Sequence, residues 1–140
     1  MLHCFIVKLL KKLLKTLTFF SIIVIDQLTK NLVSNFYPNF VSFNQGVSFG
    51  WGSRVGWQFI AAVIIVIIVI ALIGKFNWGF LFILAGGMSN LVDRIVRGEI
   101  VDWIRIPVFP WSFNLADVSI TVGLIMLILQ IARPGLAEKC

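Results

Sequence analysis

The chain has 140 residues, of which 59% are hydrophobic and only 13% are charged, and its mean hydropathy is +0.99. Ordinary soluble domains carry about 25% charged residues, so this composition excludes a soluble enzyme, a disordered chain and a disulfide scaffold. Twelve basic residues stand against six acidic ones. We therefore expect an integral membrane protein with one strongly basic segment.

The first sixteen residues form a basic amphipathic stretch. Its lysines, interleaved with apolar side chains, are Lys8, Lys11, Lys12 and Lys15. This pattern is typical of a segment facing anionic lipid headgroups, and its apolar content argues against nucleic-acid binding. A cleaved signal peptide is a further interpretation, but Asp26 and Lys30 stand where a small-residue cleavage site would follow. We expect the segment to be retained as a first membrane span.

Four apolar segments predict an all-α integral membrane protein with a single membrane domain, residues 1–140. The predicted spans cover about residues 14–33, 57–74, 78–92 and 114–132. A bilayer span takes ~20 residues, so four spans use more than half of the chain. In the third span, Gly86 and Gly87 would let another backbone approach closely. The lysines before the first span place both termini in the cytoplasm.

Two segments, 34–56 and 93–113, then lie on the outer side of the membrane. The first is rich in Asn, Ser, Gly and aromatic residues. Its short alternating runs at 40–43 and 47–49 predict a small β element. The second is expected to be a short loop or helix that carries several charged residues. Four tryptophans would share the level of the membrane interface, namely Trp51, Trp57, Trp103 and Trp111.

Four of the six acidic residues fall at the outer ends of the predicted spans, and these are Asp26, Asp93, Asp102 and Asp117. An ionised carboxylate at membrane depth costs ~2.5–3.5 kcal/mol on insertion scales, so this gathering indicates a function. Lys30 follows Asp26 by one helical turn, and Arg94 and Arg97 follow Asp93. A structural ion pair is therefore the favoured interpretation for Asp26 and Asp93.

Asp102 is flanked by Val101 and Trp103, and Asp117 by Ala116 and Val118, so neither has a basic residue beside it in the sequence. Two carboxylates at the same depth that face each other cannot both ionise, so one keeps its proton near neutral pH. Such a pair titrates as a unit and supplies one base and one acid. An aspartic protease uses this arrangement to activate a water and to protonate a leaving amine.

Other chemistries fit the sequence less well. The one histidine, His3, lies at the opposite end of the membrane, which argues against a Ser-His-Asp triad and against zinc hydrolysis. A Ser-Lys dyad would need Lys30 free of Asp26, with Ser48 or Ser89 nearby. A magnesium site built from aspartates is chemically possible, but the D-x-x-x-D spacing of membrane phosphotransferases is absent. We expect no metal and no cofactor.

Five sequence blocks carry a resemblance to a known family. They cover residues 26–30 (DQLTK), 44–49 (NQGVSF), 86–94 (GGMSNLVDR), 101–104 (VDWI) and 113–117 (FNLAD). In this order they resemble lipoprotein signal peptidases (signal peptidase II, peptidase family A8), which are bacterial membrane aspartic proteases. Ser89 departs from the family pattern, which usually has Gly there, and so do Ser48 and Val118.

The resemblance implies that Asp102 and Asp117 are the catalytic aspartates. It also implies supporting or substrate-binding roles for Asn44, Gly46, Asn90, Asp93, Arg94, Asn114, Asp26 and Lys30. The implied substrate is a prolipoprotein whose cysteine already carries diacylglycerol, and the bond cut is the one just before that cysteine.

The same resemblance implies a multi-pass protein of the bacterial cytoplasmic (inner) membrane with its active site near the outer face. Membrane lipids and the prolipoprotein are the expected partners, nucleic acid is not, and we expect a monomer. Two other readings are a small non-enzymatic transporter whose aspartates relay protons or cations, and aspartates that only cap helix ends. The transporter reading does not explain why all four aspartates gather at one membrane face.

Overall fold

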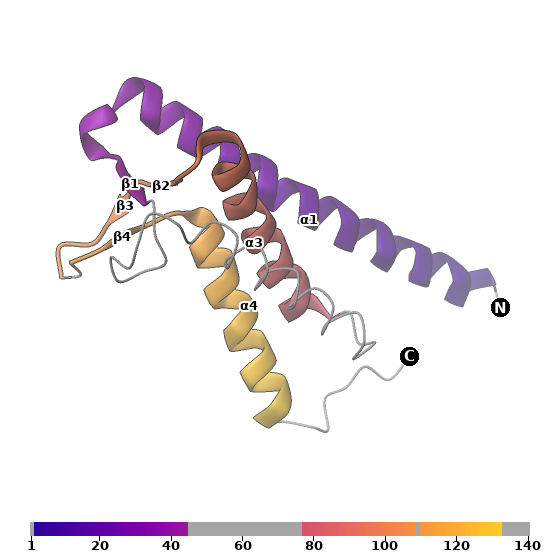
Figure 1. The fold of residues 1–140 in the computed structure, drawn as a ribbon. Helices are drawn as coiled ribbons and strands as arrows, with labels where there is room; N and C mark the ends of the chain where they lie inside the picture. The colour runs from indigo at the N-terminus through magenta and orange to yellow at the C-terminus, as the bar shows by residue number, and fades with distance from the viewer. Residues whose placement is uncertain (1, 45–76, 109, 133–140) are drawn as a thin grey trace.

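The computed structural model describes residues 2–44, 77–108 and 110–132. Three helices dominate this part of the chain: α1 (Leu2–Phe36), α3 (Trp78–Arg97) and α4 (Leu115–Ala132). They meet at the end of the molecule where the short strands lie, and the N-terminal part of α1 extends away from the other two (Figure 1). The predicted span 57–74, Gly46 and the run 47–49 lie outside the described residues.

Two of the helices, α1 and α3, are longer than the spans predicted for them. α1 begins at Leu2, so the lysine-rich stretch and the predicted span 14–33 form one helix. Leu and Lys both favour helix, and no Gly or Pro interrupts them. α3 continues past residue 92 to Arg97 and ends where Gly98 adopts φ 77°, a left-handed conformation that glycine accepts readily. Asp93 and Arg94 are therefore helical, whereas we had placed them in the outer segment.

Within the described residues, α3 is the one helix long and apolar enough to cross a membrane, and Leu115–Gln130 of α4 is a shorter apolar stretch. α1 and α4 also expose large apolar side chains, such as Leu17 and Ile128. Exposed apolar surface of this extent is typical of contact with lipid. The mostly helical fold with small β elements is confirmed, and the four spanning helices stay a prediction.

α3 and α4 pack closely because glycines face the opposing backbone. A Cβ atom on Gly86 would collide with the carbonyl oxygen of Ala116, and one on Gly79 would lie 2.9 Å from the carbonyl oxygen of Gly123. The prediction of a close approach is confirmed for Gly86. For Gly87 it stays a prediction, because no atom of the described residues lies within 4 Å of its Cβ position and the predicted span 57–74 lies outside them. This packing brings the C-terminal half of α3 against the start of α4.

The strands form two small antiparallel pairs. β1 (Ser42–Asn44), which follows the 3-10 turn η1 (Pro38–Phe40), pairs with β2 (Ile100–Asp102), and β3 (Ile104–Arg105) pairs with β4 (Ser112–Phe113). In the first pair, Ser42 lies opposite Asp102. The β element predicted for 34–56 is therefore completed by a strand from the other outer segment. This pairing joins the two outer segments above the helix ends.

Candidate active site

Asp102 is the last residue of β2 and is only 4% exposed. Its two carboxylate oxygens accept hydrogen bonds from side-chain amides: Nδ2 of Asn114 at 2.7 Å and Nδ2 of Asn44 at 3.4 Å. Strand pairing explains the second contact, because it brings Asn44 of β1 beside β2. Asp102 is thus a buried carboxylate that is held by neutral donors.

Asp117 lies in the first turn of α4 and is fixed by the cap of that helix. Its Oδ2 accepts the backbone N–H of Asn114 at 3.2 Å, and Oδ1 of Asn114 accepts the backbone N–H of Asp117 at 3.0 Å. This reciprocal pattern is a capping box, which satisfies N–H groups that the helix leaves unpaired. The other carboxylate oxygen, Oδ1, accepts from Nδ2 of Asn90 at 2.9 Å.

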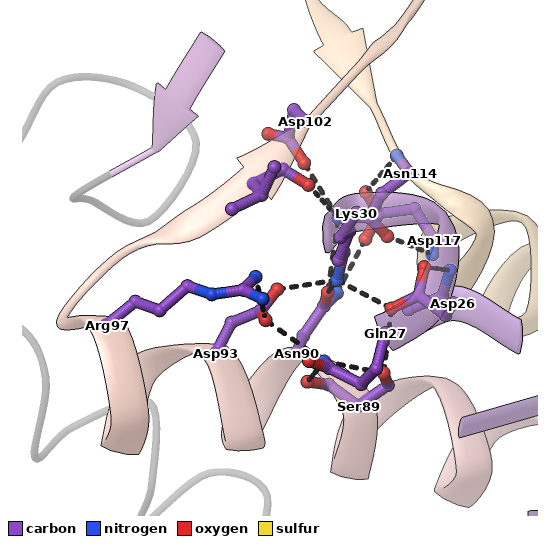
Figure 2. Close-up of polar contacts among 12 residues, drawn as sticks. Asp26, Gln27, Lys30, Ser89, Asn90, Asp93, Arg97, Asp102, Asn114 and Asp117 are labelled. Carbon is purple, nitrogen blue, oxygen red and sulfur yellow. Dashed lines mark hydrogen bonds and ion pairs between the residues drawn. The ribbon is translucent and has the colours of Figure 1, made fainter. Parts of the chain in front are cut away.

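Asn114 connects the two aspartates. It is fully buried, it follows β4 directly, and it begins α4. Through its side-chain amide it binds Asp102, and through its backbone N–H it binds Asp117. Figure 2 shows Asp102, Asn114 and Asp117 within one network of hydrogen bonds. The structure therefore brings together the two residues that the sequence singled out for acid–base chemistry.

The surroundings of Asp102 favour its neutral form. Burial and the nearby negative charge of Asp117 raise the pKa of Asp102 to about 6, although hydrogen bonds from Asn114 and Asn44 and the charge of Lys30 act in the opposite direction. A carboxyl with a pKa near 6 gains and loses its proton close to physiological pH. Proton exchange of that kind is what general acid–base catalysis requires.

Lys30 is the centre of a second, fully buried group (Figure 2). Its Nζ lies 2.6 Å from Oδ2 of Asp26 and 2.6 Å from Oδ2 of Asp93. It also donates a hydrogen bond to Oδ1 of Asn90 at 3.0 Å. The predicted Asp26–Lys30 ion pair is confirmed. Since Asn90 in turn binds Asp117, Lys30 is linked to the aspartate pair through a single side chain.

Asp93 also forms an ion pair, as predicted, but its partners are not its immediate neighbour. Besides Lys30, it binds Nη1 of Arg97 at 2.8 Å. Residues four apart share a helix face, whereas adjacent residues do not, so Arg97 can reach Asp93 while Arg94 points elsewhere. Arg94 is half-buried and attracts Asp102 electrostatically.

Two further polar side chains complete the Lys30 group. Ser89 donates from Oγ to Oδ2 of Asp26 at 2.7 Å, and Gln27 donates from Nε2 to Oδ1 of Asp93 at 3.0 Å. Oδ1 of Asp26 accepts the backbone N–H of Ala116 at 2.9 Å, which ties α1 to the start of α4. The sequence names Arg97 as a basic residue after Asp93, but it does not predict the contacts of Gln27 and Ser89. The available signal was their spacing, because Gln27 follows Asp26 directly and Ser89 precedes Asp93 by four residues.

These contacts bear on the competing interpretations. Lys30 is bound to two carboxylates, so it is not the free amine that a Ser-Lys dyad requires. Helix capping accounts for one oxygen each of Asp26 and Asp117, but it does not account for Asp102, which lies on a strand. Among the described residues, no three His, Cys, Asp or Glu side chains are arranged to hold a metal ion.

The fold is similar to that of two solved structures. Two solved structures described as a bacterial membrane enzyme, determined by the in meso method at 2.3 Å and 1.9 Å resolution, match it with TM-scores of 0.69 and 0.73. The first is 23% identical and covers 90% of this chain and 93% of its own. The second is 24% identical and covers 85% and 92%. At these identities the likeness concerns the fold.

The sequence comparison is more specific. A profile of the family described as Signal peptidase (SPase) II matches residues 18–133, and the chain belongs to this peptidase family. A lipoprotein signal peptidase of Dichelobacter nodosus is 36% identical over 115 residues, covering 71% of this chain and 75% of its own. Another from Burkholderia mallei is 31% identical over 133 residues, covering 76% and 80%. The resemblance seen in the sequence is thereby confirmed.

Proposed function

We propose that this chain is an intramembrane aspartic endopeptidase with Asp102 and Asp117 as its catalytic pair. Its family and relatives support the removal of signal peptides from prolipoproteins as its reaction, and they do not favour the transporter alternative. The observation that carries the aspartic assignment is the pair of carboxylates joined through Asn114, one of which has a raised pKa.

The proposed reaction proceeds through a water held between the two carboxyl groups. The ionised member takes a proton from the water, whose oxygen bonds to the carbonyl carbon just before the lipidated cysteine. The C–N bond of the tetrahedral intermediate then breaks, and the protonated member gives its proton to the leaving cysteine nitrogen. Because the pair titrates as a unit, the shared proton belongs to both residues.

The neighbouring polar residues position this pair. Asn114 and Asn90 each hold Asp117, and Lys30 orients Asn90 by binding its amide oxygen. Asp26 anchors the backbone of Ala116, the residue before Asp117. A carboxylate fixed by several donors loses little freedom in the reaction, and such pre-organisation lowers the barrier. We propose that Asp93 supports the same arrangement by neutralising Lys30 together with Asp26.

Three further residues complete the proposed site. Asn44 is placed to contact both Asp102 and a bound peptide, since its strand β1 adjoins β2. Gly46, outside the described residues, is proposed to grip the peptide with Asn44, and Arg94 to orient the peptide backbone beside Asp102. The proposed enzyme is a monomer with a single membrane domain that needs no cofactor.

The same contacts support a placement in the membrane. α1 and α3 run parallel: Lys15 lies over the Trp78 ring, 5.7 Å from its centroid, and Lys30 binds Asp93. Each helix separates its two contacts by about fifteen residues, or roughly 22 Å at 1.5 Å per residue. A basic, aromatic level and an acidic level are thus separated by most of a bilayer core. We propose cytoplasmic termini and an active site near the outer face of the bacterial cytoplasmic membrane.

The proposal is tested by cleavage of a diacylglyceryl-modified prolipoprotein in detergent. Asp102→Asn and Asp117→Asn should each abolish cleavage, while Glu99→Gln, which removes a nearby acid outside the pair, should retain it. The unmodified precursor, tested in parallel, should be cut poorly. Normal cleavage by both Asp→Asn variants would refute the catalytic assignment, and proton flux in liposomes that Asp102→Asn abolishes would revive the transporter alternative.

A further inference from the structure

A second feature lies at the opposite end of the helices from the aspartates. A cavity of about 610 Å³ opens between the N-terminal half of α1 and the N-terminal half of α3. Four of its lining residues are the lysines of the basic stretch, namely Lys8, Lys11, Lys12 and Lys15. Each of them stands three or four residues from two of the others, which gathers all four on one side of α1. The proposed peptidase reaction uses none of them.

The lining of this groove changes character along its length. Beyond the lysines, its described lining residues are Thr16 and Phe19 of α1 and Leu81 and Leu84 of α3, of which Leu81 is fully buried. One end of the groove therefore offers several ammonium groups, and the other offers apolar side chains. A ligand that satisfies both ends has an anionic head and a hydrocarbon tail. An acidic peptide or a nucleic acid would leave the apolar end unfilled.

The depth of the groove matches a lipid in a bilayer. Lys15 lies over the ring of Trp78, the first residue of α3, and tryptophan typically sits at the level of lipid headgroups. Lys8, Lys11 and Lys12 precede Lys15 and are exposed, so they extend from that level toward the water. Phe19 and Leu84 lie about one to two helical turns deeper, at roughly 5–10 Å. The cations are at headgroup depth and the apolar residues at acyl-chain depth.

We propose that this groove binds an anionic phospholipid of the cytoplasmic leaflet, with its phosphate among the four lysines and one acyl chain along Phe19 and Leu84. The sequence pattern alone indicated general attraction to an anionic surface. The structure adds a groove between two helices that would hold one lipid in a defined position and join the free end of α1 to α3. The proposal goes beyond the peptidase activity and involves a different end of the molecule.

The test is lipid binding to the purified full-length chain in detergent, measured by native mass spectrometry and independent of cleavage. Dioleoyl phosphatidylglycerol should bind more tightly than dioleoyl phosphatidylcholine, which has the same chains and no net charge. Glycerol phosphate, which has the charge without the chains, should compete only weakly. The preference should decline with added salt, because exposed charges are screened.

A matched variant separates a defined site from general attraction. The double substitution Lys12→Leu with Leu14→Lys moves one lysine to the opposite face of α1 and preserves both composition and net charge. It should weaken phosphatidylglycerol binding about fivefold, since a lysine near an anionic surface contributes ~1 kcal/mol. The equivalent exchange Lys8→Leu with Leu10→Lys should act similarly. Circular dichroism establishes that each variant is folded.

The apolar end has its own test. Leu84→Trp adds bulk to the groove without changing charge and should weaken phosphatidylglycerol binding, whereas Leu124→Trp, at an exposed position of α4, should not. Equal binding of the two lipids, full binding by the lysine-exchange variants, or effective competition by glycerol phosphate would each overturn the proposal. Because cleavage is not measured, Asp102→Asn should bind the lipid normally even if the catalytic assignment fails.

Discussion

The two groups of aspartates in this protein are held in different ways. Asp26 and Asp93 bind the Lys30 ammonium directly at 2.6 Å, and all three side chains are fully buried. Asp102 and Asp117 accept hydrogen bonds from amide groups of Asn44, Asn90 and Asn114. In the described part of the chain, neither of them has a lysine or arginine nitrogen within ion-pair distance.

This difference separates structural from reactive carboxylates. A buried carboxylate bound to an ammonium forms an ion pair that fastens helices together. A buried carboxylate bound to neutral amides keeps its orientation and retains access to both protonation states. The group of Asp26, Lys30 and Asp93 joins α1, α3 and the start of α4. The pair of Asp102 and Asp117 lies next to this group. The following substitutions test whether the division is real.

The largest expected effect is the loss of activity in Asp102→Asn. Removing one acid–base group should reduce kcat about 10²–10⁴-fold. Stability should respond in the opposite direction, because folding raises the pKa of Asp102 from 3.8 to about 6. The native state then favours the neutral carboxyl, and its contribution to stability is lost as pH rises through about 6. Above that pH the variant should be at least as stable as the parent in thermal unfolding, and a large drop in Tm would contradict the division.

Lys30→Met should instead reduce the stability of the fold. It leaves Asp26 and Asp93 buried without their shared cation, which typically costs about 3–5 kcal/mol of unfolding free energy. Denaturant unfolding in lipid-free detergent measures this cost. Lys12→Met, at an exposed position of the same helix, serves as the control and should stay within about 0.5 kcal/mol of the parent. If Lys30→Met unfolded like the control, the first group would not be a structural one.

Asn114 both caps α4 and holds Asp102, and two substitutions separate these roles. Asn114→Ala removes the cap of α4 and should cost about 1 kcal/mol. Asn114→Ser keeps a capping oxygen and therefore most of that stability, but it lacks the Nδ2 that donates to Asp102. Both variants should lose activity, and only the alanine variant should lose stability. Full activity in Asn114→Ser would show that the bond to Asp102 has no role in catalysis.

The smallest expected effect is a shift in a pH profile. If the active form carries one shared proton, kcat/KM should decline as pH rises through about 6, where Asp102 ionises. Asn44 stabilises the ionised form of Asp102, so Asn44→Ala should raise that pKa and move the decline to higher pH by a fraction of a unit. Ser42→Ala is the matched control, because its hydroxyl binds the backbone oxygen of Asp102 rather than the carboxylate. An unchanged pH profile in Asn44→Ala would show that the decline of kcat/KM does not report the ionisation of Asp102.

Part of this arrangement was predictable from the sequence. The four-residue spacing of Asp26 and Lys30 predicts their ion pair, and Asp102 stands out because both residues beside it, Val101 and Trp103, are uncharged. Local spacing is sufficient in both cases, because a single helix or strand determines which residues are near. The family blocks also imply a supporting role for Asn114, which lies within one helical turn of Asp117.

The remaining contacts depend on how distant elements pack. Ser89 and Gln27 are 62 positions apart in the chain and meet only because α1 crosses α3. The pairing of β1 with β2 likewise depends on where the two outer segments meet, so the alternating run alone could not name its partner. The length of α3 was underestimated because the predicted span stopped at the first charged residue. Asp93 and Arg97 stabilise each other within the helix and let it continue to Gly98.

The central claim is that Asp102 and Asp117 share a proton that is available for catalysis. Infrared difference spectroscopy of the purified enzyme, recorded across pH values around 6, observes the protonated carboxyl directly. We expect the band of one protonated carboxyl to disappear with a midpoint near 6, and to be absent from both Asp102→Asn and Asp117→Asn in that range. A band that persists with the same midpoint in the two variants, or no titrating carboxyl at all, would contradict the account.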